Sequence, residues 1–418
     1  MINCFIPFLS LPQARQTVRA LGLCDRIKNI YLLATEKIPD EVEGCEMLMI
    51  DSPASTATFR TIALHADTAY TLLYTKYTAF EPGQFAFERL LAIAGDTNAG
   101  MLYADRYLLK NGNSQQAPVI DYQKGSLRDD FDFGSLLFFR SSVLKQAVRA
   151  MDADYRFAGL YDLRLRVSEL AELVHVNEYL YSEVETDIRK SGEKLFDYVD
   201  PKNRAVQIEL EAVCTAYLKR VGGYLAPDFE PVTFDAGGFE QEASVIIPVR
   251  NRIRTIEDAI RSVLAQKTTF RFNLIIVDNH STDGTSEAIG KYTADGRVVH
   301  LVPERSDLGI GGCWNVGVHH PACGKFAVQL DSDDVYSGPD TLQKIVDAFY
   351  EQNCAMVVGT YRMTDFKMNE IPPGIIDHRE WTLENGRNNA LRINGLGAPR
   401  AFYTPVLRRI NLPNTSYG

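Results

Sequence analysis

Two short segments of the sequence carry polar side chains directly after apolar, β-branched runs. The first spans Ala243 to Arg252 and reads A-S-V-I-I-P-V-R-N-R, and the second spans Val328 to Asp334 and reads V-Q-L-D-S-D-D. In the second segment, Asp331 and Asp333 place two carboxylates one residue apart. Hard divalent cations such as Mg²⁺ and Mn²⁺ prefer oxygen ligands of this kind, and phosphate oxygens commonly complete their coordination. The pair therefore predicts a cation that is bound together with a diphosphate.

These side chains act together only if the strands before them end at one place. Between the two segments lies another apolar run, F-N-L-I-I-V-D-N-H-S-T-D-G-T, which contains Asp278 and ends in residues that cap helices. Strand, helix, strand, helix and strand in succession predict a parallel sheet, and ligands bind at the carboxyl ends of its strands. Taken alone, D-S-D-D is equally an acidic turn that caps a helix expected near Gly338.

The succession resembles the family-two glycosyltransferases of the A-type fold, from Ala243 to about Gly418. Five signatures occur in order, namely P-V-R-N, the S-V-L-A-Q helix, V-D-N-H-S-T-D-G-T, the Gly-rich W-N-V-G segment and D-S-D-D. The resemblance implies that Pro248, Arg250, Asn251, Asp278 and Asp331 bind the nucleotide and that Asp333 and Asp331 hold the metal. One departure is Trp314, which stands before Asn315 where the family often has arginine, and it puts base contacts from that segment in doubt.

The resemblance also implies a reaction, the inverting transfer of a sugar from a nucleotide-diphosphate sugar to a hydroxyl of a glycan, polysaccharide or glycolipid. The enzyme would be of the hexosyltransferase type and would depend on Mg²⁺ or Mn²⁺, which offsets the charge of the diphosphate leaving group. A carboxylate base would take the acceptor proton. The family usually places that base just after the stretch represented by L-P-N-T-S-Y-G. We therefore expect the base to lie beyond Gly418, with the domain cut short, and name no catalytic residue.

The N-terminal half repeats the same succession with different side chains at the strand ends. The alignment pairs Pro7 with Pro248, Thr35 with Asp278, Thr75 with Asp331 and Tyr77 with Asp333. Without these carboxylates the first copy has no evident way to hold a cation, and Lys76 would repel one. Asp162 occupies the place where such enzymes usually carry their base. We predict a catalytically silent copy, and the alternative is that Lys76 itself neutralises a diphosphate without a metal.

The predicted fold class is α/β, with two tandem A-type glycosyltransferase domains that are Rossmann-like, have mainly parallel sheets and are joined by a helical linker. The expected boundaries are 1–190 for the degenerate domain, 191–240 for the helical connector and linker, and 241–418 for the family-two domain. The connector is predicted from apolar residues at helical spacing between Ala205 and Val221.

A segment after D-S-D-D is rich in arginine, glycine and asparagine, which suits a loop that closes over phosphate and sugar. The candidate acceptor-binding or phosphate-binding residues in it are His378, Arg379, Trp381, Arg387 and Arg392. Arginine forks suit phosphates, and a tryptophan offers a flat face to a sugar ring. The alternative is a solvated loop with incidental charge.

The composition of the chain limits the classes of partner that it is expected to bind. The net charge of −10 argues against a nucleic-acid partner, and no apolar run approaches the ~18 residues of a membrane span. The seven cysteines are scattered and odd in number, which favours reduced thiols. We predict a cytoplasmic protein whose partners are a nucleotide-sugar donor and a glycan or lipid-linked acceptor, and peripheral membrane association stays open. The rival hypothesis is a catalytically silent scaffold that binds nucleotide sugars or glycans.

Overall fold

The computed structural model describes residues 1–37, 40–110, 112–185, 203–235, 237–393, 395–397 and 399–410. It forms two compact units: unit 1 consists of Met1–Ala226 and Glu380–Asn394, and unit 2 consists of Pro227–Arg379 and Gly395–Gly418. This division differs from the expected boundaries, because the helical part of the connector and a short later segment fold with the first half. The connector residues 191–202, like the expected C-terminal end at Gly418, lie outside the described residues.

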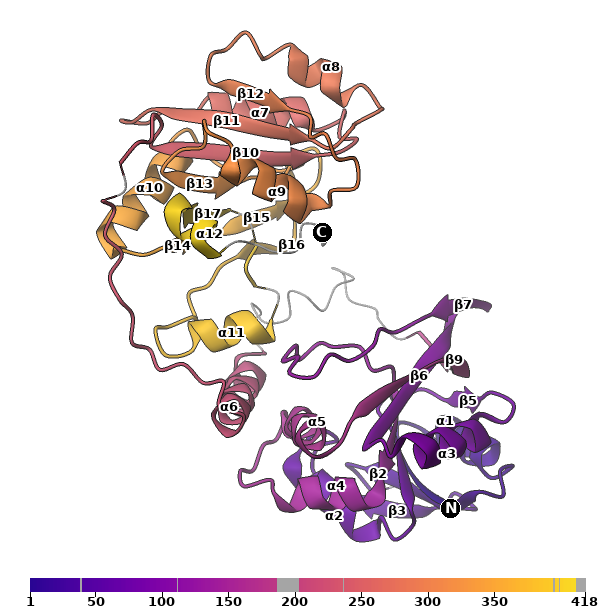
Figure 1. The fold of residues 1–418 in the computed structure, drawn as a ribbon. Coiled ribbons are helices and arrows are strands. Elements are labelled where there is room, and N and C mark those ends of the chain that lie inside the picture. Colours follow the sequence, from indigo (N-terminus) through magenta and orange to yellow (C-terminus); the bar gives the residue numbers. More distant parts are fainter. Residues whose placement is uncertain are drawn as a thin grey trace. The chain divides into compact units, whose positions relative to one another are not determined.

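Unit 1 is built around one sheet with helices on its faces (Figure 1). Its strands are β1 (Ile2–Pro7), β2 (Ile27–Ala34), β3 (Glu46–Met49), β4 (Tyr70–Tyr74), β5 (Phe80–Pro82), β6 (Met101–Lys110), β7 (Asn113–Ala117), β8 (Leu136–Arg140) and β9 (Leu173–Val184). Its helices are α1 (Leu11–Leu21), α2 (Thr56–His65), α3 (Ala86–Thr97), α4 (Ser141–Arg149), α5 (Gly159–Leu170), α6 (Arg204–Arg220) and α11 (Gly386–Arg392). The strand order is β3-β2-β1-β4-β8-β6-β9-β5, with β7 beside β6.

Helix α6 belongs to unit 1 because it caps another helix there. Glu209 on α6 accepts hydrogen bonds from the backbone N–H groups of Arg156, Phe157 and Ala158 at 3.1, 2.7 and 3.1 Å. These residues immediately precede α5, where unpaired N–H groups and the helix dipole favour a negative charge. Further along α6, Val213 and Leu218 are buried in a cluster with residues of α5.

Unit 2 has a smaller main sheet and a separate hairpin. The main strands are β10 (Ala243–Val249), β11 (Phe272–Asp278), β12 (Val298–Leu301), β13 (Phe326–Gln329), β14 (Met356–Val358) and β17 (Arg400–Tyr403), and the hairpin pairs β15 (Tyr361–Thr364) with β16 (Glu370–Ile376). The helices are α7 (Ile256–Leu264), α8 (Thr285–Gly290), α9 (Ile310–His319), α10 (Thr341–Gln352) and α12 (Thr404–Ile410). The main sheet runs β12-β11-β10-β13-β17-β14, and its first four strands are parallel.

The central strands of unit 2 are buried on both faces, as expected for a parallel sheet covered by helices. Ile247 packs in one cluster with Ile260 of α7, and its neighbour Ile246 packs in the opposite cluster with Val318 of α9. Gly317 lets α9 approach closely, because a Cβ at this position would lie 2.6 Å from Cγ2 of Ile246. The predicted α/β class with mainly parallel sheets is therefore confirmed. Across the described residues, no helix is both long enough and apolar enough to traverse a lipid bilayer.

The two sheets share an order over six strands. In unit 1 the order is β3-β2-β1-β4-β8-β6, and in unit 2 it is β12-β11-β10-β13-β17-β14. In both, the fifth strand of this order is antiparallel to its two neighbours. Such a correspondence is what an internal repeat would produce.

The strand registers allow positions in the two sheets to be compared. Pro7 lies opposite Leu33, and Pro248 lies opposite Val277. The next residue along the second strand is Ala34 in unit 1 and Asp278 in unit 2, so Asp278 corresponds to Ala34 rather than to the predicted Thr35. When the registers of the central pairs are continued by two residues, Thr75 falls beside Pro7 and Asp331 beside Pro248, in agreement with the alignment.

Candidate functional site

Three polar loops meet at the carboxyl edge of the unit 2 sheet. Pro248 is the penultimate residue of β10, Asp278 ends β11, and Asp331 follows β13 by two residues. The strands β11, β10 and β13 are neighbours and parallel, so their ends and the loops after them lie side by side. Pro248 is buried in the sheet, whereas Arg250 in the loop after it is exposed.

Asn251 joins two of these loops. Its backbone N–H donates to Oγ of Ser281 at 2.9 Å, and its Oδ1 accepts from the N–H of Thr282 at 2.8 Å. Asn251 has a φ of 56°, in the left-handed region that asparagine tolerates better than most residues. Its side-chain oxygen is thus used inside the protein, which gives Asn251 a structural role at the edge of the site.

Asp278 is buried and held as a carboxylate. It accepts hydrogen bonds from the N–H of Ser281 at 3.0 Å and from Oγ of Ser286, and Nε2 of His300 lies 3.5 Å from Oδ2. Burial raises the pKa of Asp278, but the hydrogen bonds from Ser286 and Ser281 outweigh it, so that the pKa lies below its usual value. The carboxylate is fully buried and already hydrogen-bonded, so it fixes the loop after β11 against the end of its strand.

The D-S-D-D segment gathers negative charge at the same edge. The side chain of Asp333 is 46% exposed, and Nε of Arg252 lies 3.7 Å from its Oδ2. Asp331 is half-buried and accepts from Nε2 of Gln329 at 3.2 Å. Burial, together with Asp331 and Asp333, raises the pKa of Asp334 to about 6. Two accessible carboxylates fit Mg²⁺ or Mn²⁺, with diphosphate oxygens completing the coordination.

One basic residue of this edge has no role in the sequence prediction. Arg252 is the basic side chain that faces Asp333, and its place two residues after Arg250 in the R-N-R run was the available signal. In the Gly-rich segment, Trp314 is buried and packs 6.3 Å from the ring of Phe402, so it belongs to the core rather than to a base-binding surface. The next residue, Asn315, has a buried Oδ1 without a hydrogen-bond partner in the described part of the chain.

The structure divides the predicted acceptor loop between the two units. His378 and Arg379 lie in unit 2, whereas Trp381, Arg387 and Arg392 lie in unit 1. Burial lowers the pKa of His378, and Arg379 pairs with Asp377 at 2.7 Å.

The two arginines in unit 1 are occupied there. Arg387 donates from Nε to the carbonyl of Leu225 at 2.6 Å and from Nη2 to the hydroxyl of Tyr224 at 3.1 Å. Arg392 is 1% exposed and pairs with Asp129. These guanidinium groups are already hydrogen-bonded within unit 1. The prediction that Arg387 and Arg392 bind phosphate is therefore wrong.

The matching edge of unit 1 holds an internal ion-pair cluster. Nζ of Lys76 lies 2.5 Å from Oε1 of Glu183, which is fully buried and also accepts from Nε of Arg106 at 2.9 Å. Unit 1 thus has a paired ammonium group near the position where unit 2 has carboxylates. Asp162 is also paired, since Nε of Arg166 lies 2.9 and 3.0 Å from its two oxygens. A buried carboxylate held in this way has a structural role rather than that of a free base.

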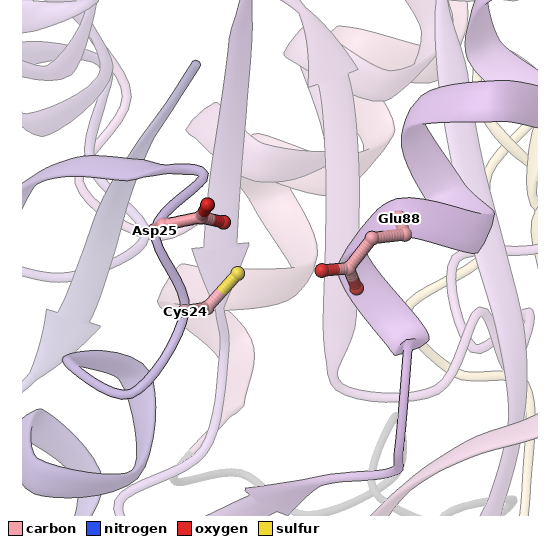
Figure 2. Close-up of side chains that lie close together, drawn as sticks. All are labelled: Cys24, Asp25 and Glu88. Carbon is pink, nitrogen blue, oxygen red and sulfur yellow. The ribbon is translucent and has the colours of Figure 1, made fainter.

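One other group of potential metal ligands occurs in unit 1 (Figure 2). Ligand atoms of Cys24, Asp25 and Glu88 lie within 4.8 Å of one another, and no other such trio is found among the described residues. Asp25 and Glu88 are exposed, and Arg26 lies 3.6 Å from Asp25. Exposed acidic groups often approach one another without a metal, so we assign no ion to this trio.

Comparison with known proteins addresses the second half of the chain. Residues 244–409 match the model of the family Glycosyl transferase family 2. This span is a glycosyl transferase family 2 domain. The match covers less than half of the 418 residues and includes all three polar loops.

Curated relatives match shorter stretches. The putative teichuronic acid biosynthesis glycosyltransferase TuaG of Bacillus subtilis is 33% identical over 120 residues, which are 29% of this chain and 46% of TuaG. An uncharacterized glycosyltransferase of Rickettsia felis is 38% identical over 97 residues, which are 23% of this chain and 15% of the relative. The chain thus spans less than half the length of either relative.

Solved structures show a distant likeness. The Staphylococcus aureus TarS fragment 1–349 has a TM-score of 0.34 and 24% identity, over 41% of this chain and 49% of TarS 1–349. The mannosyltransferase PcManGT of Pyrobaculum calidifontis, in complex with GDP-Man and Mn²⁺, has a TM-score of 0.33 and 17% identity, over 54% of this chain and 61% of that protein.

Proposed function

We propose that unit 2 binds a nucleotide-diphosphate sugar and that the protein transfers the sugar, with inversion, to an acceptor hydroxyl. The observation that carries the proposal is the pair Asp331 and Asp333 at the sheet edge that also holds Asp278 and Arg252. The family match of residues 244–409 supports the reaction class. TuaG is named for teichuronic acid biosynthesis, and we extend assembly of a surface polysaccharide or glycolipid to this chain as part of the proposal.

Different residues of this edge would bind the metal, the nucleoside and the phosphates. Asp333 and Asp331 would hold Mg²⁺ or Mn²⁺, which when bound offsets the charge of the diphosphate leaving group. Asp278 would accept hydrogen bonds from the nucleoside once a contact with Ser281 or Ser286 opens, because its side chain is otherwise fully buried. Arg252 and Arg250 are exposed beside this edge, and guanidinium groups bind phosphate oxygens well. We assign no base among the described residues.

We infer that unit 1 is a second copy of the same fold that does not bind a metal-linked donor. The shared strand order supports a common fold, and the pairing of Lys76 with the buried Glu183 supports the loss of the metal site. Replacing Lys76 with methionine should therefore leave Mn²⁺-dependent nucleotide binding unchanged. If this substitution abolishes binding, Lys76 neutralises a diphosphate and the inference about unit 1 is wrong.

A thermal-shift screen of nucleotide-diphosphate sugars with and without Mn²⁺ tests the main proposal. A ligand that binds only the native state raises the melting temperature. We expect at least one donor to do so only with Mn²⁺, and we expect Asp333→Asn to remove the shift. The matched control is Asp307→Asn, an exposed aspartate of unit 2 that pairs with Arg305, and it should keep the shift. A panel without any metal-linked shift in the wild-type protein would overturn the proposal.

A further inference from the structure

The β15–β16 hairpin of unit 2 has a tip that is fixed by its own hydrogen bonds. Oδ1 of Asp365 accepts from the N–H groups of Lys367 and Asn369 at 2.8 and 2.9 Å. The N–H of Asp365 donates to the carbonyl of Asn369 at 2.9 Å. The hairpin forms its own two-stranded sheet, outside the main sheet of the unit (Figure 1). The side chains at its tip are therefore presented by an ordered backbone.

This ordered hairpin exposes large apolar side chains. At the tip, Phe366 is 76% exposed and Met368 is 62% exposed. On β16, Ile371 is 37% exposed and Ile375 is 46% exposed. Single exposed apolar residues are common, but several on one small element indicate an interaction surface. The hydrogen bonds of the hairpin thus fix a backbone that exposes apolar side chains to water. Such a surface suits the binding of an apolar partner.

Two cationic side chains lie at the apolar tip although the whole chain is acidic. The guanidinium of Arg254 lies 5.4 Å from the ring centroid of Phe366, and Lys367 is exposed between the two apolar residues. Of the nearby acids, Glu370 is offset by its pair with Arg362 at 2.5 Å, and Asp365 binds the tip backbone, which leaves Arg254 and Lys367 against one carboxylate. The tip therefore offers cations beside apolar groups, whereas the chain has a net charge of −10.

We propose that this hairpin inserts Phe366 and Met368 into the interface of an anionic lipid membrane. Apolar side chains flanked by Lys and Arg bind there, because the apolar groups enter the acyl boundary and the cations meet lipid phosphates. A stable protein partner normally covers about 1,200–2,000 Å² in total, which is far more than a hairpin tip offers.

The contact with Arg254 connects the hairpin to the donor site. Arg254 lies in the loop after β10, two residues beyond Arg252, which faces Asp333. A membrane held at the tip would thus lie near the edge where the donor binds, and an acceptor carried by a lipid would reach that edge. This last step rests on the proposed function, whereas membrane binding by the hairpin does not.

Vesicle sedimentation of the full chain tests the proposal. We expect binding to vesicles of equal parts phosphatidylglycerol and phosphatidylcholine, weaker binding in high salt, and little binding to phosphatidylcholine alone. The double variant Phe366→Ser, Met368→Ser should reduce the partition coefficient by about tenfold or more, because two apolar side chains are lost from the interface. The matched control Leu23→Ser, Leu64→Ser changes two apolar residues of unit 1 that are 85% and 81% exposed, and it should bind as the wild type does.

The outcomes separate this proposal from the proposed function. Equal binding by the hairpin variant and the wild type, or no binding to the anionic vesicles, would overturn it. A different outcome is that the wild type self-associates without lipid and that the hairpin variant alone loses this self-association. That result would assign the surface to a second copy of the chain and would also overturn the membrane proposal. Nucleotide binding is measured without lipid and should persist in the hairpin variant, so a failure of donor binding leaves the membrane result intact.

Discussion

Replacing Arg392 with methionine should destabilise unit 1 by about 3–5 kcal/mol, the usual cost of removing one partner of a buried ion pair. Arg392 is 1% exposed, and the side chain of its partner Asp129 is 12% exposed. Nε and Nη2 of Arg392 also donate to Oδ1 of Asn389 at 3.3 and 2.9 Å. Burial raises the pKa of Asp129 even though Arg392 lowers it, so without Arg392 the carboxyl group would be buried without a counter-charge. Adding Asp129→Asn to the variant should therefore recover part of the loss.

Urea unfolding measures this loss in unit 1 alone. The chain has two tryptophans, Trp314 in unit 2 and Trp381 in unit 1, so Trp381 reports on unit 1 in a Trp314→Phe background. The control is Arg89→Met, since Arg89 and Glu178 form an exposed pair in unit 1, and solvent screening leaves such a pair with little effect on stability. If Arg392→Met lowers the free energy of unfolding by no more than the control does, the assignment of Glu380–Asn394 to unit 1 is refuted.

Two further predictions concern unit 2. Asp278 has a pKa below its usual value when folded, so its contribution to stability is present above about pH 4 and is lost as the pH falls further. In a Trp381→Phe background, unfolding followed by Trp314 fluorescence between pH 3 and 7 should show this loss, and Asp278→Asn should remove that part of the pH dependence; an unchanged profile would contradict it. Gly317→Ala should cost about 1–3 kcal/mol, because the new Cβ would lie 2.6 Å from Cγ2 of Ile246. Gly290→Ala, with open space around its Cβ in α8, should be neutral or stabilising, and equal losses at both glycines would argue against close packing of α9.

The sheet of unit 2 could be predicted from sequence because its strands are continuous apolar runs followed by polar residues. Burial on both faces requires such runs, and parallel connection brings their ends to one edge. For this reason Asp278 and Asp331 were expected at one edge of the sheet, and the structure places them at the ends of β11 and β13, the two strands that flank β10. The offset between Thr35 and Ala34 shows the limit of this reasoning, since matching chain segments without their sheet register leaves an uncertainty of one residue.

The partners of the arginines could not be predicted from sequence. Arg387 and Arg392 were expected to face phosphate because guanidinium groups among glycines and asparagines suit that role. Their partners Tyr224 and Asp129 are far away in the chain, and only tertiary folding brings them together. Likewise, the pattern around Trp314 did not reveal that its ring turns into the core of unit 2.

The most direct test of the central claim is anomalous diffraction at the manganese edge from crystals grown with Mn²⁺ and a nucleoside diphosphate. The proposal predicts a manganese peak within coordination distance of the carboxylates of Asp333 and Asp331, with diphosphate oxygens as further ligands. Density for the nucleotide elsewhere, with Asp333 still facing Arg252 and no metal beside it, would contradict the proposal.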